Sequence, residues 1–128
     1  MLEQSKWNVI VVDDEKDNVG VIQMVFEFND AKVRPAYSGK ECLMLLEQEV
    51  PSFLLVDINM PEMSGYQLLE KIRENEAWRS VPIIAVTALA RPEDKQDIMN
   101  AGFDGYIGKP ITIMTLIEQV SKILEAKG

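Results

Sequence analysis

The sequence predicts a doubly wound α/β domain, in which helices cover both faces of a five-stranded parallel sheet. Short apolar runs rich in β-branched residues alternate along the chain with longer segments of helical periodicity. Two of these runs, Phe53–Val56 and Ile83–Val86, are apolar without alternation, which is typical of strands buried on both faces. The 128 residues, of which 47% are hydrophobic, are enough for a single core, so we expect one domain.

The strands are assigned from the short apolar runs. We expect five of them, at Val9–Val12, Val33–Tyr37, Phe53–Val56, Ile83–Val86 and Tyr106–Ile107. Helical segments separate consecutive strands, and such connections are right-handed crossovers between parallel strands. The chain shows no internal repeat, low-complexity segment or linker, so we assign residues 1–128 to one domain.

The helices are expected between and after these strands, at Asp17–Phe28, Gly39–Glu47, Ser64–Asn75, Pro92–Ala101 and Ile113–Ala126. Ser64 is a suitable N-cap, and Pro92 fits the first turn of its helix. The last helix has the clearest pattern, because the apolar residues between Leu116 and Leu124 recur at the spacing of one helical face.

The segment Pro92–Ala101 differs from the other expected helices. It offers the core little beyond Ile98, Met99 and Ala101. Elements with few buried apolar contacts open more readily than the rest of a fold. We therefore expect this helix to be among the less firmly held elements and a candidate moving part.

Composition excludes several classes of function. The net charge of −8 argues against nucleic acid as a partner, because phosphate contacts need clustered Lys and Arg. The absence of histidine removes histidine-based catalysis and histidine metal ligands. No apolar run is long enough to cross a membrane and no signal peptide is recognisable, so we expect a soluble, cytoplasmic protein. Cys42, the only cysteine, is expected to be a buried small hydrophobe.

Polar residues with distinct chemistry follow the strands. They are Asp13 and Asp14 after the first strand, Asp57 after the third, Thr87 after the fourth and Lys109 after the fifth. In a sheet of the flavodoxin-like order 2-1-3-4-5, the first and third strands are neighbours and ligands bind beyond the carboxyl ends of the strands. The three aspartates should therefore converge in one pocket.

Three converging carboxylates need a counter-charge, because two like charges about 4 Å apart repel by roughly 4 kcal/mol near a protein surface. Carboxylate oxygens without histidine or thiolate favour a hard divalent cation, and Mg²⁺ is the physiological choice. A bound Mg²⁺ would attract a phosphoryl group, whose oxygens Lys109 and Thr87 could contact. Asp57 is then placed to act as a carboxylate nucleophile.

With these residues at its strand ends, the chain resembles the receiver domains of response regulators in two-component signalling. The resemblance runs essentially from end to end. It rests on "VVDDE" at 11–15, "LLVDINMPEMSG" at 54–65, "VTA" at 86–88 and "YIGKP" at 106–110, in the order and spacing of the family. Each motif alone is weak, and the four together on alternating strands and helices are specific.

The resemblance implies a role for each residue at the strand ends. Asp57 would be the phosphoacceptor, Asp14 a direct metal ligand and Asp13 a ligand acting largely through water. The backbone carbonyl of Asn59 would supply a further metal ligand. Lys109 and Thr87 would contact the phosphoryl group.

The resemblance also implies features of the switch. Tyr106 matches the aromatic position whose ring turns inward as the threonine is drawn toward the phosphate. The Lys109-Pro110 peptide bond is expected to be cis, as it is in the family. Asn59 and Leu89 occupy positions that tune the lifetime of the phosphoryl group.

The leading hypothesis is a phosphorylation-activated signalling switch that catalyses only its own phosphorylation and dephosphorylation. Without histidine, it would take the phosphoryl group from a histidine kinase, a histidine phosphotransfer protein or a small acyl phosphate. By resemblance, an output protein would bind the face formed by the fourth helix, the fifth strand and the fifth helix. No output domain is visible in the sequence.

Three alternatives remain open. A Mg²⁺-dependent phosphatase of the haloacid dehalogenase type would need Asp-x-Asp after the first strand, where this chain has Asp13-x-Glu15. A flavodoxin-like FMN binder would need a first loop rich in Ser, Thr and Gly. A degenerate receiver could serve only as a docking module, although every chemical position is filled.

Two further patterns are assigned structural roles. The glycines at 102 and 108 are separated by five residues and Pro110 follows Lys109, so the segment does not match a nucleotide-binding P-loop. The methionines at 60, 63, 99 and 114 are expected to fill the core, and Trp7 and Trp78 to pack beside strands.

Overall fold

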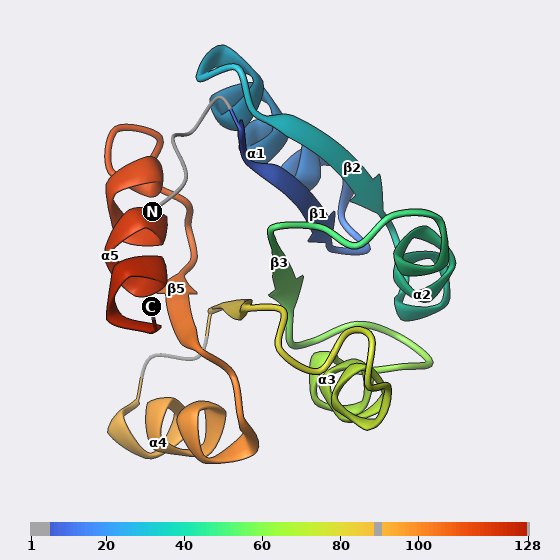
Figure 1. Cartoon of the computed structure of the whole chain (residues 1–128). Coiled ribbons are helices and arrows are strands. Elements are labelled where there is room, and N and C mark those ends of the chain that lie inside the picture. The colour runs from blue at the N-terminus through green and yellow to red at the C-terminus, as the bar shows by residue number, and fades with distance from the viewer. Residues whose placement is uncertain (1–5, 89–90, 128) are drawn as a thin grey trace.

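The computed structural model describes residues 6–88 and 91–127. Five parallel strands form one sheet: β1 Asn8–Val12, β2 Lys32–Ala36, β3 Phe53–Asp57, β4 Ile83–Thr87 and β5 Gly105–Gly108. Their order is β2-β1-β3-β4-β5, so the predicted topology is confirmed (Figure 1). The strand bounds differ from the predicted ones by one residue at most, as at β2, which begins and ends one residue earlier.

Five helices connect or follow the strands: α1 Lys16–Phe28, α2 Gly39–Gln48, α3 Gly65–Glu74, α4 Pro92–Ala101 and α5 Leu116–Lys127. The buried residues form two clusters, one on each face of the sheet. Helices α1 and α5 contribute to one cluster, and α2, α3 and α4 to the other. The two layers explain why the strands are apolar on both faces.

Alternation along β1 shows how one strand serves both layers. Val9 and Val11 pack with α1 and α5, whereas Ile10 and Val12 pack with α2 and α3. Successive side chains of a strand point to opposite faces, so a buried central strand needs apolar residues at every position. The predicted double winding follows directly from this pattern.

Helix α5 begins three residues later than the sequence predicts. Residues 113–115 form a turn, in which the Thr115 N–H donates to the carbonyl of Thr112. Ile113 and Met114 are 50% and 91% exposed, so the apolar stripe that defines the helix begins only at the buried Leu116. The predicted start at Ile113 was therefore wrong, because an apolar residue there has no core to face.

The methionines divide into two groups. Met60 and Met63 are partly buried and pack against the core, as expected. Met99 and Met114 are exposed, so the prediction that they fill the core was wrong for these two. Trp7 and Trp78 are buried, which confirms their packing role.

Helix α3 begins with a complete capping box. The Ser64 side chain accepts from the Gln67 N–H, and the Gln67 side chain accepts from the Ser64 N–H. The predicted N-cap at Ser64 is thus confirmed, and this reciprocal arrangement satisfies two otherwise orphaned donors. A Cβ atom added to Gly65 would lie 2.6 Å from the carbonyl oxygen of Asp57, so the helix starts in direct contact with the end of β3.

Helix α4 has a different attachment. Pro92 stands in its first turn as predicted, and only Asp94 and Ile98 of the helix are buried. Arg91 makes a two-pronged ion pair with Asp94 at 3.0 Å. The expectation of a sparsely packed helix is confirmed, although Met99 and Ala101 contribute less to the core than expected.

Across residues 6–88 and 91–127, none of the helices combines the length and the apolar character that a membrane span requires.

Candidate functional site

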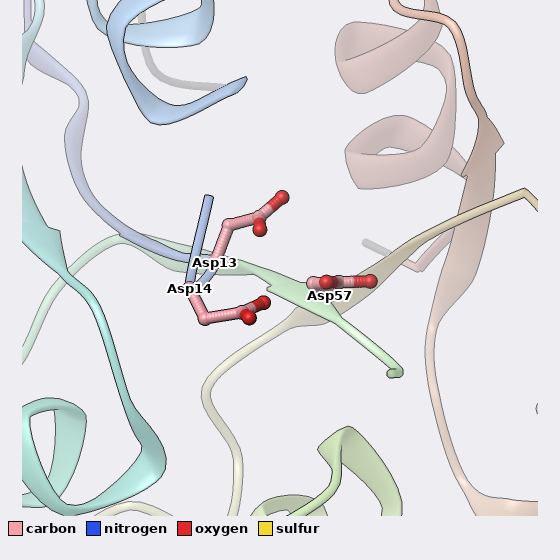
Figure 2. Close-up of side chains that lie close together, drawn as sticks. All are labelled: Asp13, Asp14 and Asp57. Atoms are coloured by element: carbon pink, nitrogen blue, oxygen red, sulfur yellow. The ribbon is translucent and has the colours of Figure 1, made fainter. Parts of the chain in front are cut away.

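Three carboxylates meet where β1 and β3 end. Asp13 and Asp14 follow β1, and Asp57 is the last residue of β3. The pairing of Val12 with Val56 brings these two strand ends side by side. One carboxylate oxygen from each aspartate lies within 4.8 Å of the others, and Figure 2 shows the three side chains together. The predicted convergence of the aspartates is therefore present in the structure.

Asp13 is the most fully engaged of the three carboxylates. It is buried, and its Oδ1 accepts from the Glu15 N–H at 2.9 Å. Its Oδ2 accepts from the Lys109 Nζ at 3.1 Å and from the Asn18 Nδ2 at 3.3 Å. These donors fix the orientation of Asp13 and balance part of its charge.

Asp14 is exposed, in contrast to its neighbour Asp13. Consecutive residues at a strand end point to opposite sides, which explains how one carboxylate is buried while the next reaches solvent. An exposed carboxylate at the mouth of the site can change its hydration at little cost. Asp14 is thus the member of the cluster best suited to exchange water for a metal ion.

Asp57 is held at the centre of the site. Its Oδ1 accepts from the Asn59 N–H at 3.3 Å and lies 3.5 Å from the Lys109 Nζ, and its side chain is 6% exposed. Burial raises the pKa of Asp57 to about 6, and the charge of Asp13 acts in the same direction. Lys109 and the Asn59 N–H offset part of this rise. The carboxylate is ionised at pH 7, but its neighbours in the protein balance only part of its negative charge.

Lys109 is tied to the site through both its backbone and its side chain. Its N–H donates to the carbonyl of Thr87 at 2.8 Å, just beyond the pairing of Thr87 with Gly108. Burial alone would lower the pKa of Lys109, but its hydrogen bond to Asp13 and the charges of Asp13 and Asp57 raise it overall. The residue is therefore a permanent cation. The Lys109-Pro110 peptide bond is cis, as the resemblance implies.

The remaining predicted residues lie on β4, on β5 and in the segment after β3. Thr87 is buried at the end of β4, and Tyr106 is half-buried on β5. Asn59 is exposed two residues beyond Asp57. Leu89 lies outside the described residues, so its predicted role has no structural counterpart here.

Two residues that contribute to the site were not predicted from the sequence. Asn18 donates to Asp13 from the first turn of α1, and its only signal is its position one helical turn beyond the acidic run. Gly65 lets α3 approach the backbone of Asp57 and Ile58, since a Cβ there would lie 2.6 Å and 2.8 Å from their atoms. Its signal is a glycine at the first position of a helix, where an N-cap residue precedes it.

The donor set fits a hard divalent cation. Carboxylate oxygens are the only strong metal ligands in the cluster, and an oxygen-only set suits Mg²⁺ better than softer metals. Two of the carboxylates are buried and face a single ammonium group, which leaves excess negative charge at the site. The one thiol of the chain takes no part, because Cys42 is buried and burial raises its pKa to about 12.

Sequence comparison identifies relatives over nearly the whole chain. A protein of 14.6 kDa from Leptolyngbya boryana, itself uncharacterized, is 38% identical over 118 residues, which are 92% of this chain and 90% of that protein. The polar-differentiation response regulator DivK of Brucella ovis is 32% identical over 117 residues, which are 91% of this chain and 95% of DivK.

Solved structures show the same fold. The chemotaxis response regulator CheY4 of Vibrio cholerae superposes with a TM-score of 0.86 at 25% identity, over 91% of this chain and 98% of CheY4. The receiver domain of the Francisella response regulator 1452 gives a TM-score of 0.84 at 30% identity, over 96% of this chain and all of that domain.

A family model described as the response regulator receiver domain matches residues 9–121. This range contains every strand end that contributes to the acidic site. The chain therefore belongs to the receiver domains of response regulators, the family that operates in two-component signalling.

Proposed function

We propose that the protein is a phosphorylation-controlled signalling switch in which Asp57 accepts a phosphoryl group with the help of Mg²⁺. The observation that carries the proposal is the meeting of three carboxylates with the ammonium of Lys109 at one edge of the sheet. A carboxylate nucleophile needs a neighbouring cation to draw in an anionic phosphoryl donor. Membership of the receiver family supports the same assignment.

The proposed metal site consists of Asp13, Asp14, Asp57 and the backbone carbonyl of Asn59. When bound, Mg²⁺ would neutralise charge on the carboxylates and on the phosphoryl oxygens. Asp14 enters from the solvent side, while Asp13 is oriented by its hydrogen bonds to Lys109 and Glu15. These different surroundings suit Asp14 to direct ligation and Asp13 to ligation largely through water.

The transfer step uses the carboxylate of Asp57 as nucleophile. Its Oδ1 is held by the Asn59 N–H, whereas its Oδ2 accepts no hydrogen bond from the described residues. A carboxylate oxygen attacks the phosphorus atom and forms an acyl phosphate. The P–N bond of a phosphohistidine, or the P–O bond of an acyl phosphate, breaks, and the donor leaves with the electron pair. Lys109 and the hydroxyl of Thr87 stabilise the charge on the phosphoryl oxygens.

The signal would leave the site through β4, α4 and β5. In this proposal, Thr87 moves toward the phosphoryl group and the ring of Tyr106 turns inward. Helix α4 has only two buried side chains, so it follows this change at low cost. An output protein then recognises the face formed by α4, β5 and α5, and the phosphoryl group comes from a histidine kinase or a histidine phosphotransfer protein in the cytoplasm.

Intact-protein mass spectrometry after incubation with acetyl phosphate tests the proposal. Wild-type protein should gain one phosphoryl group, about 80 Da, when Mg²⁺ is present, and none when the metal is chelated. Asp57→Asn should gain none. Asp30→Asn is the matched control, because Asp30 is exposed in the turn between α1 and β2, away from the strand ends that form the site.

Three results would contradict the proposal. They are the absence of a phosphoryl group on the wild type, its persistence on Asp57→Asn, and its independence of divalent metal. Steady hydrolysis of many phosphomonoesters would instead favour a phosphatase.

A further inference from the structure

We propose that Lys95 of α4 is a positioning residue for Tyr106. The contact of Lys95 with the ring favours the half-exposed position of the ring over a position turned into the core. The residue would thereby set how readily the switch responds. This inference deepens the proposed function, on which it rests for the consequences of phosphorylation. Its geometric part concerns the unphosphorylated protein and can be tested alone.

The proposal begins with a contact between α4 and β5. The Nζ of Lys95 lies 5.6 Å from the centroid of the Tyr106 ring. A cation within about 6 Å of an aromatic centroid is attracted by the negative face of the ring. Among the residues that the structure describes, no carboxylate lies within ion-pair distance of this ammonium. The ring is therefore the principal partner of Lys95.

The exposure of the two residues indicates which position of the ring the contact favours. Lys95 is exposed and Tyr106 is half-buried. An ammonium group is strongly hydrated, and its transfer into an apolar interior is costly. Lys95 can thus remain over the ring only while part of the ring reaches the surface. A ring that turns fully inward loses the contact, so the contact stabilises the half-exposed position.

The position of Lys95 on α4 strengthens this argument. It lies three residues before Ile98, the buried apolar residue of this helix. Tyr106 packs against the same core cluster as Ile98. The contact of Lys95 with the ring is therefore one of the interactions that link α4 to β5, which lies beside it in Figure 1.

The expected effect is moderate. A cation–π contact at an exposed site changes the ratio of two ring positions about two- to five-fold. A change of this size adjusts the balance of a two-state switch without locking it in either state. Lys95 is thus a tuning residue for the resting protein.

The experiment measures the exposure of the tyrosine rings by NMR. Protein with ring-labelled tyrosine is titrated with a soluble paramagnetic reagent, without phosphoryl donor and without divalent metal. The chain has three tyrosines, and the Tyr106 signal is assigned by its loss in Tyr106→Phe. Lys95→Gln removes the charge but keeps a hydrated side chain, and Lys95→Arg restores a cation. Lys122→Gln removes a charge from an exposed ion pair on α5 and serves as the matched control.

The proposal expects the ring of Tyr106 to become less accessible in Lys95→Gln, with a two- to five-fold increase in the inward population. Lys95→Arg and Lys122→Gln should resemble the wild type. Equal accessibility in Lys95→Gln and wild type would overturn the proposal. So would a similar change in Lys122→Gln, because the effect would then follow net charge.

A second arm separates this inference from the proposed function. The same proteins are incubated with acetyl phosphate and Mg²⁺, and the added mass is recorded with the ring accessibility. If no phosphoryl group is added but Lys95→Gln still shifts the ring, the proposed function fails and the role of Lys95 in positioning the ring stands. If phosphorylation occurs and the ring accessibility is the same in both proteins at every stage, the role of Lys95 is overturned.

Discussion

Helices α3 and α4 follow the strands whose ends carry Asp57 and Thr87, but they are attached to the fold in different ways. Helix α3 has a complete capping box, and Gly65, Leu68, Leu69 and Ile72 are buried. Helix α4 buries only Asp94 and Ile98, and Asp94 is a charged residue paired with Arg91. The helix that follows Asp57 is therefore firmly packed, and the helix that follows Thr87 is held by few contacts.

This difference indicates how a local change of charge becomes a directed movement. Asp57 is fixed because α3 begins against its backbone carbonyl. In the proposed function, a phosphoryl group added to Asp57 would not easily displace β3 or α3, so the structural response would be confined to β4, α4 and β5. The packing thus selects the direction in which the proposed signal travels.

The largest expected effect is the loss of a buried side chain from α3. Leu68 is fully buried, and Leu68→Ala should lower the free energy of unfolding by about 3 kcal/mol, because it leaves a cavity in the core. The matched substitution in α4, Met99→Ala, should cost less than about 1 kcal/mol, since Met99 is 44% exposed. Urea denaturation followed by circular dichroism measures both. Equal losses would remove the distinction between the two helices.

The second prediction concerns the contact between α3 and Asp57. Gly65→Ala should lower the free energy of unfolding by about 1–3 kcal/mol, because the new Cβ would overlap the backbone of β3. It should also weaken Mg²⁺ binding, as the displaced carbonyl belongs to Asp57. Gly20→Ala is the matched control, since a Cβ on this exposed glycine of α1 meets no atom within 4 Å. That control should gain about 0.5–1 kcal/mol from helix propensity.

The third prediction tests the charge at the packed end of β3. Because the pKa of Asp57 is raised to about 6, the folded protein retains this proton to a higher pH than the unfolded chain does. Stability is therefore lost as the pH rises from about 4 to about 6. In the absence of divalent metal, Asp57→Asn should be more stable than wild type at pH 7.5 by about 1–2 kcal/mol, which allows for screening of the charges by solvent.

This gain should disappear below about pH 4, where the carboxyl group of the wild type is protonated in both the folded and the unfolded state. Saturating Mg²⁺ should reverse the order of the two proteins, since the metal stabilises only a chain that binds it. Thermal denaturation at several pH values, with and without metal, provides the measurement. A wild type that is more stable than Asp57→Asn at pH 7.5 without metal would contradict the conclusion that the buried negative charge of Asp57 destabilises the folded protein.

The smallest expected effect is on α4 alone. Arg91→Gln removes the two-pronged ion pair with Asp94 at the start of this helix. The midpoint of urea denaturation should scarcely change, whereas the amide hydrogens of α4 should exchange several-fold faster. Native-state hydrogen exchange measured by NMR checks this, with the amides of α3 as the internal reference. Faster exchange in α3 as well would show that the two helices open together.

The sequence was sufficient to predict the position of every strand, because buried strands are runs of apolar residues. The order 2-1-3-4-5 was taken from flavodoxin-like folds, since apolar runs alone do not decide which strands are neighbours. The sequence also predicted the meeting of Asp13, Asp14 and Asp57, since strand ends in a parallel sheet share one edge. The start of α5 could not be predicted as closely, because Ile113 and Met114 continue the apolar pattern although they face solvent.

The finer structure of the site could not be predicted from residue types alone. Alternation at the strand end places Asp13 and Asp14 on opposite sides, but residue types alone do not say which of the two is buried against Lys109. The contact of Gly65 with β3 and the contact of Lys95 with Tyr106 depend on how helices approach the sheet. Such distances follow from tertiary packing, which local patterns do not contain.

The burial of Cys42 has a practical consequence for studying the site. Because burial raises the pKa of its thiol to about 12, Cys42 stays protonated over the pH range in which Asp57, with its pKa raised to about 6, changes charge. The chain also contains no histidine. Calorimetric titration of Mg²⁺ near pH 6, in buffers of different ionisation enthalpy, would therefore detect a proton displaced from Asp57 by the proposed metal binding without a contribution from a thiol or an imidazole. The charge of Asp57 can thus be followed without interference from a thiol or an imidazole.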